Sequence, residues 1–351
     1  MSQSEFVQER SIRTIQEHPN ADSLAIIKVG SFQIVHSLEE AKKLRVGQLV
    51  LHFPTDICID PDKAVELGVD TYCRSVDYKG QGKAKCRIVA ARLRGAPSYG
   101  FIKVDYEKTL DYDEHYGVWK YEPPEPSTNG SRERYSHPEF PKYTKMKRIQ
   151  LDPGAWTVNL PVRVTEKLHG QNCRLGVVRE NGEWRFMVGS HNVILKNQEG
   201  NPFWQLLDEK VMTLLNELCN GENPVVIFGE RLGKGVQDMD YGFETPTLRV
   251  FDIMVNGEYL DWDLVQAHCE HAGVLTVPLL YEGGFSWCMV DNMTDGQSVL
   301  QHPDRYLSKF KGREGIVITP LKETVDARGN RLIAKSISAD YESRKGGTEY
   351  H

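Results

Sequence analysis

Apolar and polar residues alternate over short stretches in the first 120 residues, a pattern typical of half-buried β-strands. This alternation predicts strands at residues 24–29, 32–36, 49–53, 86–93 and 99–104. Gly30 and Ser31 separate the first two strands and predict a two-residue hairpin turn. A helix is expected at residues 37–44. Short strands with few turns and one helix favour a small barrel, so we predict an OB-like β-barrel domain over residues 1–120.

From residue 144 onward, apolar runs that suit buried strands alternate with helical patterns. Strands are predicted at residues 188–190, 225–230, 248–255, 316–319 and 331–337. Asn201 and Pro202 predict the start of a helix. Its inward face would carry Phe203, Leu206, Leu207, Leu214, Leu215 and Leu218. Asp261 starts a second predicted helix, which ends at Gly273. We therefore predict an α+β domain over residues 144–351.

The segment between these halves, residues 121–143, is rich in proline. Its five prolines and a Ser-Thr-Asn-Gly-Ser patch oppose a long helix or a central strand. We interpret residues 121–143 as a partly extended linker between the two domains.

The composition is that of an ordinary globular protein, since 40% of the residues are hydrophobic and 26% are charged. No apolar run reaches the roughly 18 residues of a membrane-spanning helix. The first residues also lack the basic and apolar regions of a signal peptide. We therefore expect a cytoplasmic protein, and a monomer. Seven scattered cysteines without a Cys-x-x-Cys spacing argue against a disulfide framework and a structural zinc site.

The formal net charge of −6 argues against binding of nucleic acid over the whole surface, but it leaves a local basic groove open. The fourth predicted strand and its flanks carry the basic residues Lys83, Lys85, Arg87, Arg92 and Arg94. These residues form either a nucleic-acid-binding face or a solvated outer face of the barrel. The sequence does not distinguish the two.

Candidate chemistry begins at residues 165–172, Thr-Glu-Lys-Leu-His-Gly-Gln-Asn. Lys167 ends a short alternating strand, Gly170 lets the backbone pass close to a ligand, and Asn172 offers an amide to a hydroxyl or a phosphate. A nucleophilic lysine at the floor of a nucleotide pocket would be presented in this way. The Lys-x-x-Gly spacing alone is weak evidence, because it occurs by chance in many chains.

Five further segments each join an apolar strand to a polar residue. They are Val-Gly-Ser-His-Asn at 188–192, Phe-Gly-Glu at 228–230, Phe-Asp-Ile at 251–253, Glu-Gly-Ile-Val at 314–317 and Ala-Lys-Ser-Ile-Ser at 334–338. The second continues into Gly-Val-Gln-Asp-Met-Asp-Tyr-Gly at 235–242. Asp252 lies in mid-strand, where a carboxylate is costly without a partner.

In this order, Lys-x-x-Gly and the later motifs resemble the series of the covalent nucleotidyltransferases, the superfamily of ATP-dependent ligases and mRNA capping enzymes. The resemblance covers about residues 145–345. The spellings Glu-Lys-Leu-His-Gly-Gln-Asn and Leu-Arg-Val-Phe-Asp-Ile resemble RNA ligases rather than DNA ligases. A barrel that precedes this domain is similar to RNA ligase family 5, typified by the Naegleria and Deinococcus enzymes.

The resemblance implies an adenylation domain of antiparallel sheets with flanking helices, and an ATP-dependent RNA ligase that uses Mg²⁺ or Mn²⁺. Lys167 would carry AMP and Lys335 would neutralise the α-phosphate. His191 would contact the RNA 5′-phosphate, where many RNA ligases have an arginine. Glu314 would hold the metal through water, with Glu230 and Asp252 as further candidates. The implied nucleotide-binding residues are Lys147, Arg148, Glu166, Gly170, Asn172, Glu230 and Phe251.

Two other functions stay open at this stage. A capping-type guanylyltransferase shares the Lys-x-x-Gly chemistry but uses GTP. A non-catalytic RNA-binding protein could also be built on a ligase scaffold, although every motif residue that the chemistry needs is present. The sequence does not indicate whether the RNA ends belong to a nicked duplex, a broken tRNA or two single strands.

Overall fold

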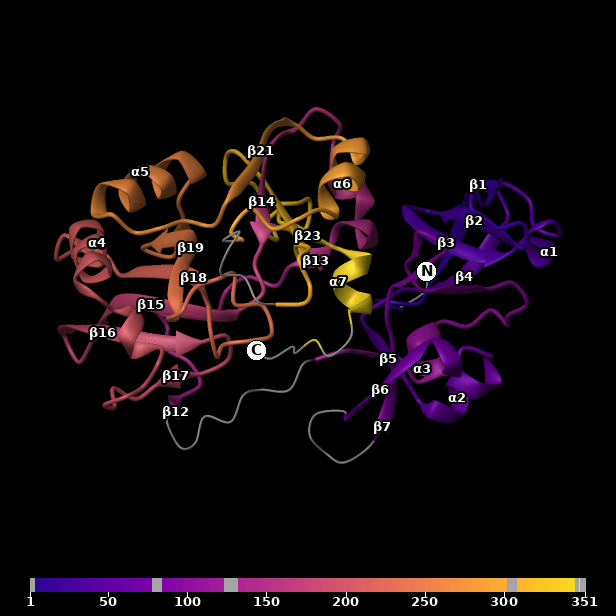
Figure 1. Ribbon diagram of the computed structural model, residues 1–351. Coiled ribbons are helices and arrows are strands. Elements are labelled where there is room, and N and C mark those ends of the chain that lie inside the picture. Colours follow the sequence, from indigo (N-terminus) through magenta and orange to yellow (C-terminus); the bar gives the residue numbers. More distant parts are fainter. Residues whose placement is uncertain (1–3, 78–83, 123–131, 302–307, 345–346, 348–351) are drawn as a thin grey trace. The chain divides into compact units, whose positions relative to one another are not determined.

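The computed structural model describes residues 4–77, 84–122, 132–301, 308–344 and 347 (Figure 1). These residues form two compact units. The first unit holds residues 4–122 together with 338–344, and the second holds residues 132–337. None of the helices in the described ranges is long and apolar enough to cross a membrane.

The first unit is built on antiparallel β-sheet. Its larger sheet has the strand order β10 (Phe101–Lys103), β4 (Leu49–Phe53), β1 (Gln8–Glu17), β2 (Leu24–Val29) and β3 (Phe32–Ser37). A smaller sheet follows the order β11 (Trp119–Lys120), β5 (Ile57–Ile59), β7 (Ala84–Ile88) and β6 (Cys73–Asp77). Gly30 adopts a left-handed φ of 59° between β2 and β3, which confirms the predicted hairpin. The barrel-like architecture predicted for this half is also confirmed.

Several elements of the first unit differ from the prediction. The strand expected at residues 86–93 is two strands, β7 and β8 (Ala91–Leu93), and the helix at 37–44 is the single turn α1 (Leu38–Ala41). Strand β1 was not predicted, because its sequence Gln-Glu-Arg-Ser-Ile-Arg-Thr-Ile-Gln-Glu is mostly polar and only Ile12 is buried. Helices α2 (Pro61–Glu66) and α3 (Tyr112–Tyr116) complete the unit.

The chain returns to the first unit after β23. Helix α7 (Ala339–Ser343) packs against β8, where Arg92 forms an ion pair with Asp340. Arg74 donates to the carbonyl oxygens of Glu342 and Arg344, both at 3.3 Å. Residues 338–344, predicted as part of the second domain, thus belong to the first unit.

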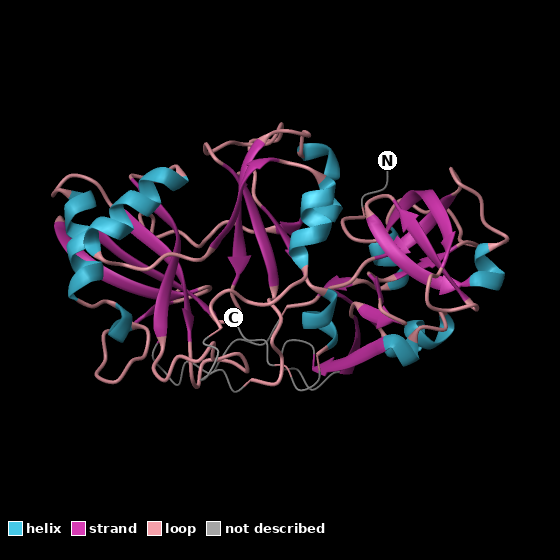
Figure 2. Ribbon diagram, turned by 45° about the horizontal axis from the view of Figure 1, so that its top comes forward, coloured by secondary structure: helices cyan, strands magenta, loops and turns pink. Residues whose placement is uncertain are grey.

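The second unit contains two sheets (Figure 2). The seven-stranded sheet has the order β12 (Arg132–Arg134), β17 (Ile194–Leu195), β16 (Glu183–Ser190), β15 (Gln171–Glu180), β18 (Val225–Leu232), β19 (Thr247–Val255) and β20 (Glu258–Tyr259). The five-stranded sheet has the order β13 (Lys147–Arg148), β23 (Ala334–Ile337), β22 (Gly315–Pro320), β14 (Pro161–Lys167) and β21 (Leu279–Gly284). Strands β13 and β23 pair in parallel, and the other strand pairs of the described residues are antiparallel. The predicted α+β class is confirmed.

Three helices cover these sheets. Helices α4 (Glu209–Cys219) and α5 (Trp262–Ala272) pack on the seven-stranded sheet, and α6 (Trp287–Thr294) packs on β22 and β23 (Figure 1). Gly273 ends α5 in the left-handed conformation, as predicted. The start predicted at Asn201 is wrong: the side chain of Asp208 caps α4 at the backbone N–H of Val211, 2.9 Å away.

The predicted linker lies partly outside the described residues, since 123–131 are not described. Its later part belongs to the second unit. Strand β12 pairs with β17, and Phe140 is buried in the core beside Val178, Met187 and Phe228. Residues 132–143 are therefore structural parts of the second unit.

Candidate active site

Lys167 ends strand β14 and lies opposite Gly315 on β22. Its Nζ is 2.6 Å from Oε1 of Glu314, the residue that precedes β22. A Cβ on Gly315 would lie 2.1 Å from the carbonyl oxygen of Ser336, so only glycine allows β22 to approach β23 this closely. The packing of three strands thereby brings the Glu314 carboxylate to the Lys167 amine.

Lys335 and Arg148 lie on the next two strands of the same sheet. Arg148 on β13 is opposite Lys335 on β23. Across the next two strands, Lys335 is opposite Val317 on β22, and Val317 is opposite Thr165 on β14. Opposed residues point to the same face of a sheet, and so do residues two apart on one strand. Arg148, Lys335 and Lys167 therefore share a face. Lys147 is exposed and alternates to the other face.

The seven-stranded sheet contributes Glu230 and Asn172, which are opposed on β18 and β15. Burial raises the pKa of Glu230 to about 8, while Lys167 opposes this shift and Glu314 reinforces it. Glu230 is therefore close enough to Lys167 and Glu314 to interact with both charges. Oδ1 of Asn172 is buried and has no hydrogen-bond partner among the described residues. Such an acceptor suits a ligand hydroxyl.

Gly170 is the point at which the loop after Lys167 passes over β18. A Cβ at this position would lie 2.3 Å from the carbonyl oxygen of Arg231 and 2.9 Å from Cγ of Glu230. The prediction that the backbone needs glycine here for a close approach is consistent with this geometry, although the neighbour is β18 rather than a ligand.

Phe251 occupies a β-bulge in strand β19. Phe228 is opposite Asp252 and Gly229 is opposite Val250, so Phe251 has no partner across the β18–β19 pair. Its ring lies 4.8 Å from the ring of Tyr143 and stays partly exposed. Bulges commonly re-aim a side chain beside a site. A partly exposed aromatic ring of this kind suits stacking on a planar ligand.

Two predicted site residues have other partners. Glu166 alternates with Lys167 and points to the opposite face, where its Oε2 accepts from the backbone N–H of Val299 at 2.9 Å. Asp252 is 1% exposed and lies 2.9 Å from nitrogens of both Arg163 and Arg331. Neither carboxylate is brought together with Lys167. Strand alternation and arginine neutralisation fix these side chains, and a role for either in binding the nucleotide or the metal stays a prediction.

The remaining carboxylates fit a divalent cation. The described residues include no cluster of three or more His, Cys, Asp and Glu side chains that could hold a metal. Glu230 and Glu314 are instead a pair whose mutual repulsion contributes to the raised pKa of Glu230. Mg²⁺ in nucleotide sites typically uses one or two carboxylates, phosphate oxygens and water, and this pair matches that pattern.

His191 lies in the turn between β16 and β17, and a buried arginine shapes that turn. Arg174 is fully buried and donates to the carbonyl oxygens of Ser190, at 2.9 Å, and Val193, at 3.2 Å. The turn is therefore fixed from inside the sheet, while the His191 side chain is half-buried.

The basic residues predicted along the barrel strand are mostly paired. Lys85, Arg87 and Arg92 form ion pairs with Asp60, Asp56 and Asp340, respectively. Lys83 lies outside the described residues. The described part of this strand therefore favours a structural use of the charges over an open basic face.

No role was predicted for His169 or for residues 235–242. In the structure these two segments lie together. Nε2 of His169 is 2.7 Å from Oδ1 of Asp238, and the backbone N–H of His169 donates to the Tyr241 hydroxyl at 2.7 Å. The two segments are about 70 residues apart, so no local pattern could have paired them. The only signal in the sequence for a role of His169 was its place between Lys167 and Gly170.

Comparison with known proteins identifies the class of this chain. The sequence profile of the family described as RNA ligase matches residues 160–337, more than half of the chain. The chain belongs to the RNA ligase family.

Solved structures of the Naegleria gruberi RNA ligase share the whole fold. A lysine-to-methionine mutant with AMP and Mn is 21% identical, with a TM-score of 0.71, over 96% of this chain and 98% of that one. The ligase with PPi is 23% identical, with a TM-score of 0.70, over 96% and 97%. A lysine-to-alanine mutant with ATP and Mn is 22% identical, with a TM-score of 0.71, over 96% and 98%. No curated protein sequence matches the chain.

Proposed function

We propose that the chain is an ATP-dependent RNA ligase that joins 3′-hydroxyl and 5′-phosphate RNA ends through AMP carried on Lys167, in RNA repair. One observation carries the proposal, which is the arrangement of charged groups around the Lys167 amine. Its Nζ lies 2.6 Å from Glu314, its charge acts on Glu230, and Lys335 lies on the same face of the sheet. The related Naegleria gruberi structures with ATP, AMP and Mn support ATP as the substrate and a divalent metal as the cofactor.

The reaction balances in three transfers. The Lys167 nitrogen attacks the α-phosphorus of ATP, so that an N–P bond forms and pyrophosphate leaves. A 5′-phosphate oxygen of RNA then attacks the same phosphorus, breaks the N–P bond and gives a 5′–5′ pyrophosphate. Finally a 3′-hydroxyl attacks the RNA 5′-phosphate and AMP leaves. Lys167 must give up a proton before the first attack, and the carboxylate of Glu314 lies within hydrogen-bond distance to receive it.

The other residues bind and orient the reactants. Lys335 and Arg148 face the phosphates and stabilise the negative charge that develops on them. Asn172 accepts from a ribose hydroxyl, and Phe251 stacks on the adenine. Glu230 and Glu314 would hold Mg²⁺ or Mn²⁺, which supplies Lewis-acid polarisation of the phosphate when bound. His191 contacts the RNA 5′-phosphate.

Labelling with α-³²P nucleotide tests the proposal. We expect label from ATP, with Mg²⁺ or Mn²⁺, to remain on the denatured wild-type protein and to be absent from Lys167→Ala. Lys322→Ala is the matched control, because Lys322 is an exposed lysine of the same unit that pairs with Asp261. Label from GTP but not ATP would indicate a capping-type guanylyltransferase. An unlabelled wild-type protein would favour the non-catalytic RNA-binding alternative.

A joining assay then defines the substrate. RNA and DNA ends with 3′-hydroxyl and 5′-phosphate groups are compared as nicked duplexes and as single strands. We expect joining of RNA ends by the wild-type protein and none by Lys167→Ala. Joining of DNA ends alone would contradict the RNA ligase proposal.

A further inference from the structure

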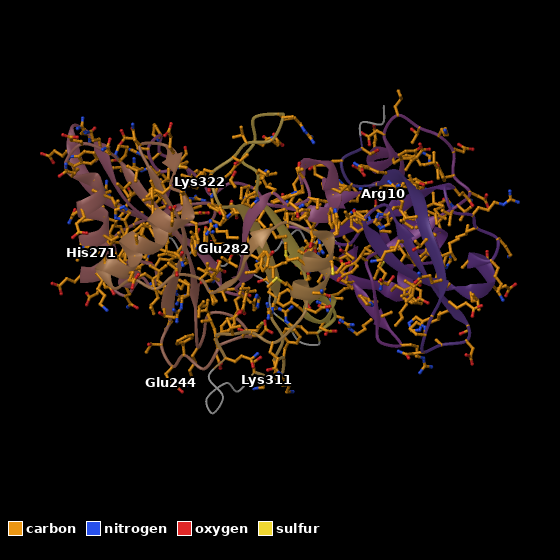
Figure 3. All side chains as sticks on the ribbon, turned by 90° about the horizontal axis from the view of Figure 1, so that it is seen from above. Arg10, Glu244, His271, Glu282, Lys311 and Lys322 are labelled. Carbon is orange, nitrogen blue, oxygen red and sulfur yellow. The ribbon has the colours of Figure 1, made fainter. Side chains whose placement is uncertain are left out.

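The loop between β18 and β19 folds over the segment that follows Lys167. Gln237 donates through Nε2 to the carbonyl oxygen of Gly170, and Tyr241 accepts from the backbone N–H of His169. Asp238 lies 2.7 Å from Nε2 of His169. Three side chains of one short stretch thus contact two consecutive residues of Lys-x-x-Gly. Figure 3 shows Glu244, near the end of this loop, and Lys311, three residues before Glu314, on the same side of the second unit.

The contacts continue from Asp238 to the nucleophile. His169 is 3% exposed, and its Nδ1 lies 3.9 Å from Oε2 of Glu314. The other oxygen of that carboxylate, Oε1, is 2.6 Å from Nζ of Lys167. Asp238, His169, Glu314 and Lys167 therefore form one continuous chain of polar side chains, which joins a loop of the seven-stranded sheet to the end of β14.

Backbone geometry indicates that the loop is held in a defined conformation. Tyr241 is fully buried with a φ of 55°, a left-handed conformation that a non-glycine residue keeps only where its surroundings hold it. Its hydroxyl nevertheless meets the backbone of His169. Tyr241 contacts the backbone of His169, whereas Asp238 contacts its imidazole ring. The two contacts are separate, so Asp238 can set the orientation of the ring without fixing the backbone.

We infer that Asp238 is a positioning residue for adenylylation. By holding Nε2 of His169, it keeps the imidazole against Glu314, and it thereby fixes the carboxylate at the Lys167 amine. The inference rests on the proposed role of Lys167 and extends it to a loop for which no role has been assigned. Its effect belongs to the first transfer, because only that step uses the Lys167 nitrogen as the attacking group.

The test separates the first transfer from the last. Single-turnover formation of lysyl-AMP is measured for wild type, Asp238→Ala, Asp238→Asn, His169→Ala and the double variant Asp238→Ala/His169→Ala. The same proteins then join RNA that already carries a 5′-adenylate, which bypasses the attack by Lys167. We expect Asp238→Ala to slow lysyl-AMP formation about tenfold or more, which is the range for losing a hydrogen bond to a charged group.

Three further results are expected. Asparagine retains an oxygen that can accept from Nε2, so Asp238→Asn should recover to within about threefold of wild type. The double variant should be no slower than His169→Ala, because residues that act through one contact are non-additive. Joining of the pre-adenylylated RNA by Asp238→Ala should stay within about threefold of wild type, because that step does not use the Lys167 nitrogen as the attacking group.

Asp240→Asn is the matched control, since Asp240 lies in the same loop and accepts from the backbone N–H of Gly242. Equal losses in both assays, multiplicative effects of the two single variants, or normal lysyl-AMP formation by Asp238→Ala would each overturn the inference. If Asp238→Ala unfolds early in a melting curve, Asp238→Ser replaces it, because serine is too short to reach His169. Absence of lysyl-AMP on the wild-type protein would instead contradict the proposed function.

Discussion

Two acidic residues of the second unit show how the surroundings of a carboxylate decide its use. Burial raises the pKa of Asp252, but Arg331 and Arg163 outweigh it and hold that pKa below its ordinary value. Glu230 is half-buried, and Lys167 only partly offsets the desolvation, so the pKa of Glu230 rises to about 8. Two arginines therefore keep Asp252 charged and neutralise it within the protein, whereas Glu230 has no such partner and a bound cation would favour its charged form.

Replacing Asp252 should reduce stability rather than metal use. Asp252→Asn leaves Arg163 and Arg331 buried without their anionic partner, so we expect the free energy of unfolding to fall by about 3 kcal/mol or more. The Mn²⁺ concentration for half-maximal lysyl-AMP formation should stay unchanged. Urea denaturation and a metal titration measure the two quantities. Glu314→Gln should show the opposite pattern, and a raised metal requirement in Asp252→Asn would return Asp252 to the metal site.

At the scale of the elements, the site depends on how closely the loop after β14 crosses β18. Gly170→Ala would place a Cβ 2.3 Å from the carbonyl oxygen of Arg231, so the loop must move away from the strand. A displacement of about 1 Å at a reacting group can cost about 100-fold in rate, and we expect a loss of that order in lysyl-AMP formation. Rapid-quench labelling with ATP measures it.

Gly154→Ala is the control for that substitution, because no atom lies within 4 Å of the Cβ that it would add. It should form lysyl-AMP at the wild-type rate. A Gly170→Ala protein that labels as fast as Gly154→Ala would show that the crossing has room for a methyl group.

The elements that the sequence predicted are those whose pattern is local. Strand β2 alternates clearly and β4 is a short apolar run, and both were predicted with their observed bounds. The bulge at Phe251 was not predictable, because it depends on the register between β18 and β19. The contact between His169 and Asp238 depends on the course of a loop. The side of the sheet on which Glu166 lies follows from strand alternation, which places it opposite to Lys167.

At the scale of the whole molecule, the two units have separate cores, and the chain passes from the second unit back to the first at Ser338. Strand β23 carries Lys335 in the second unit, and Ser338 begins the segment that packs on the first unit as α7. Ser338 caps that helix at the backbone N–H of Tyr341. The few residues between Lys335 and α7 therefore connect a strand of the second unit directly to the barrel-like unit.

The first unit should set the acid limit of the molecule's stability. His52 is fully buried beside Phe32, and its Nε2 lies 3.0 Å from the carbonyl oxygen of Tyr99. Burial and the nearby Arg10 lower the pKa of His52 to about 3. An unfolded histidine has a pKa of about 6.5, so the unfolded state binds the extra proton between these values. The contribution of neutral His52 to the free energy of unfolding is therefore complete above about pH 6.5 and is lost as the pH falls toward 3.

His52→Gln isolates this contribution, because glutamine keeps an N–H for the Tyr99 carbonyl oxygen but does not titrate. One titrating group changes stability by about 1.4 kcal/mol per pH unit. Between pH 7 and pH 5, we expect the free energy of unfolding of the wild-type protein to fall by about 2 kcal/mol more than that of His52→Gln. Urea denaturation at both pH values measures the difference. His271→Gln, at an exposed position in α5 (Figure 3), should follow the wild type, and parallel curves for all three proteins would assign the acid sensitivity to other groups.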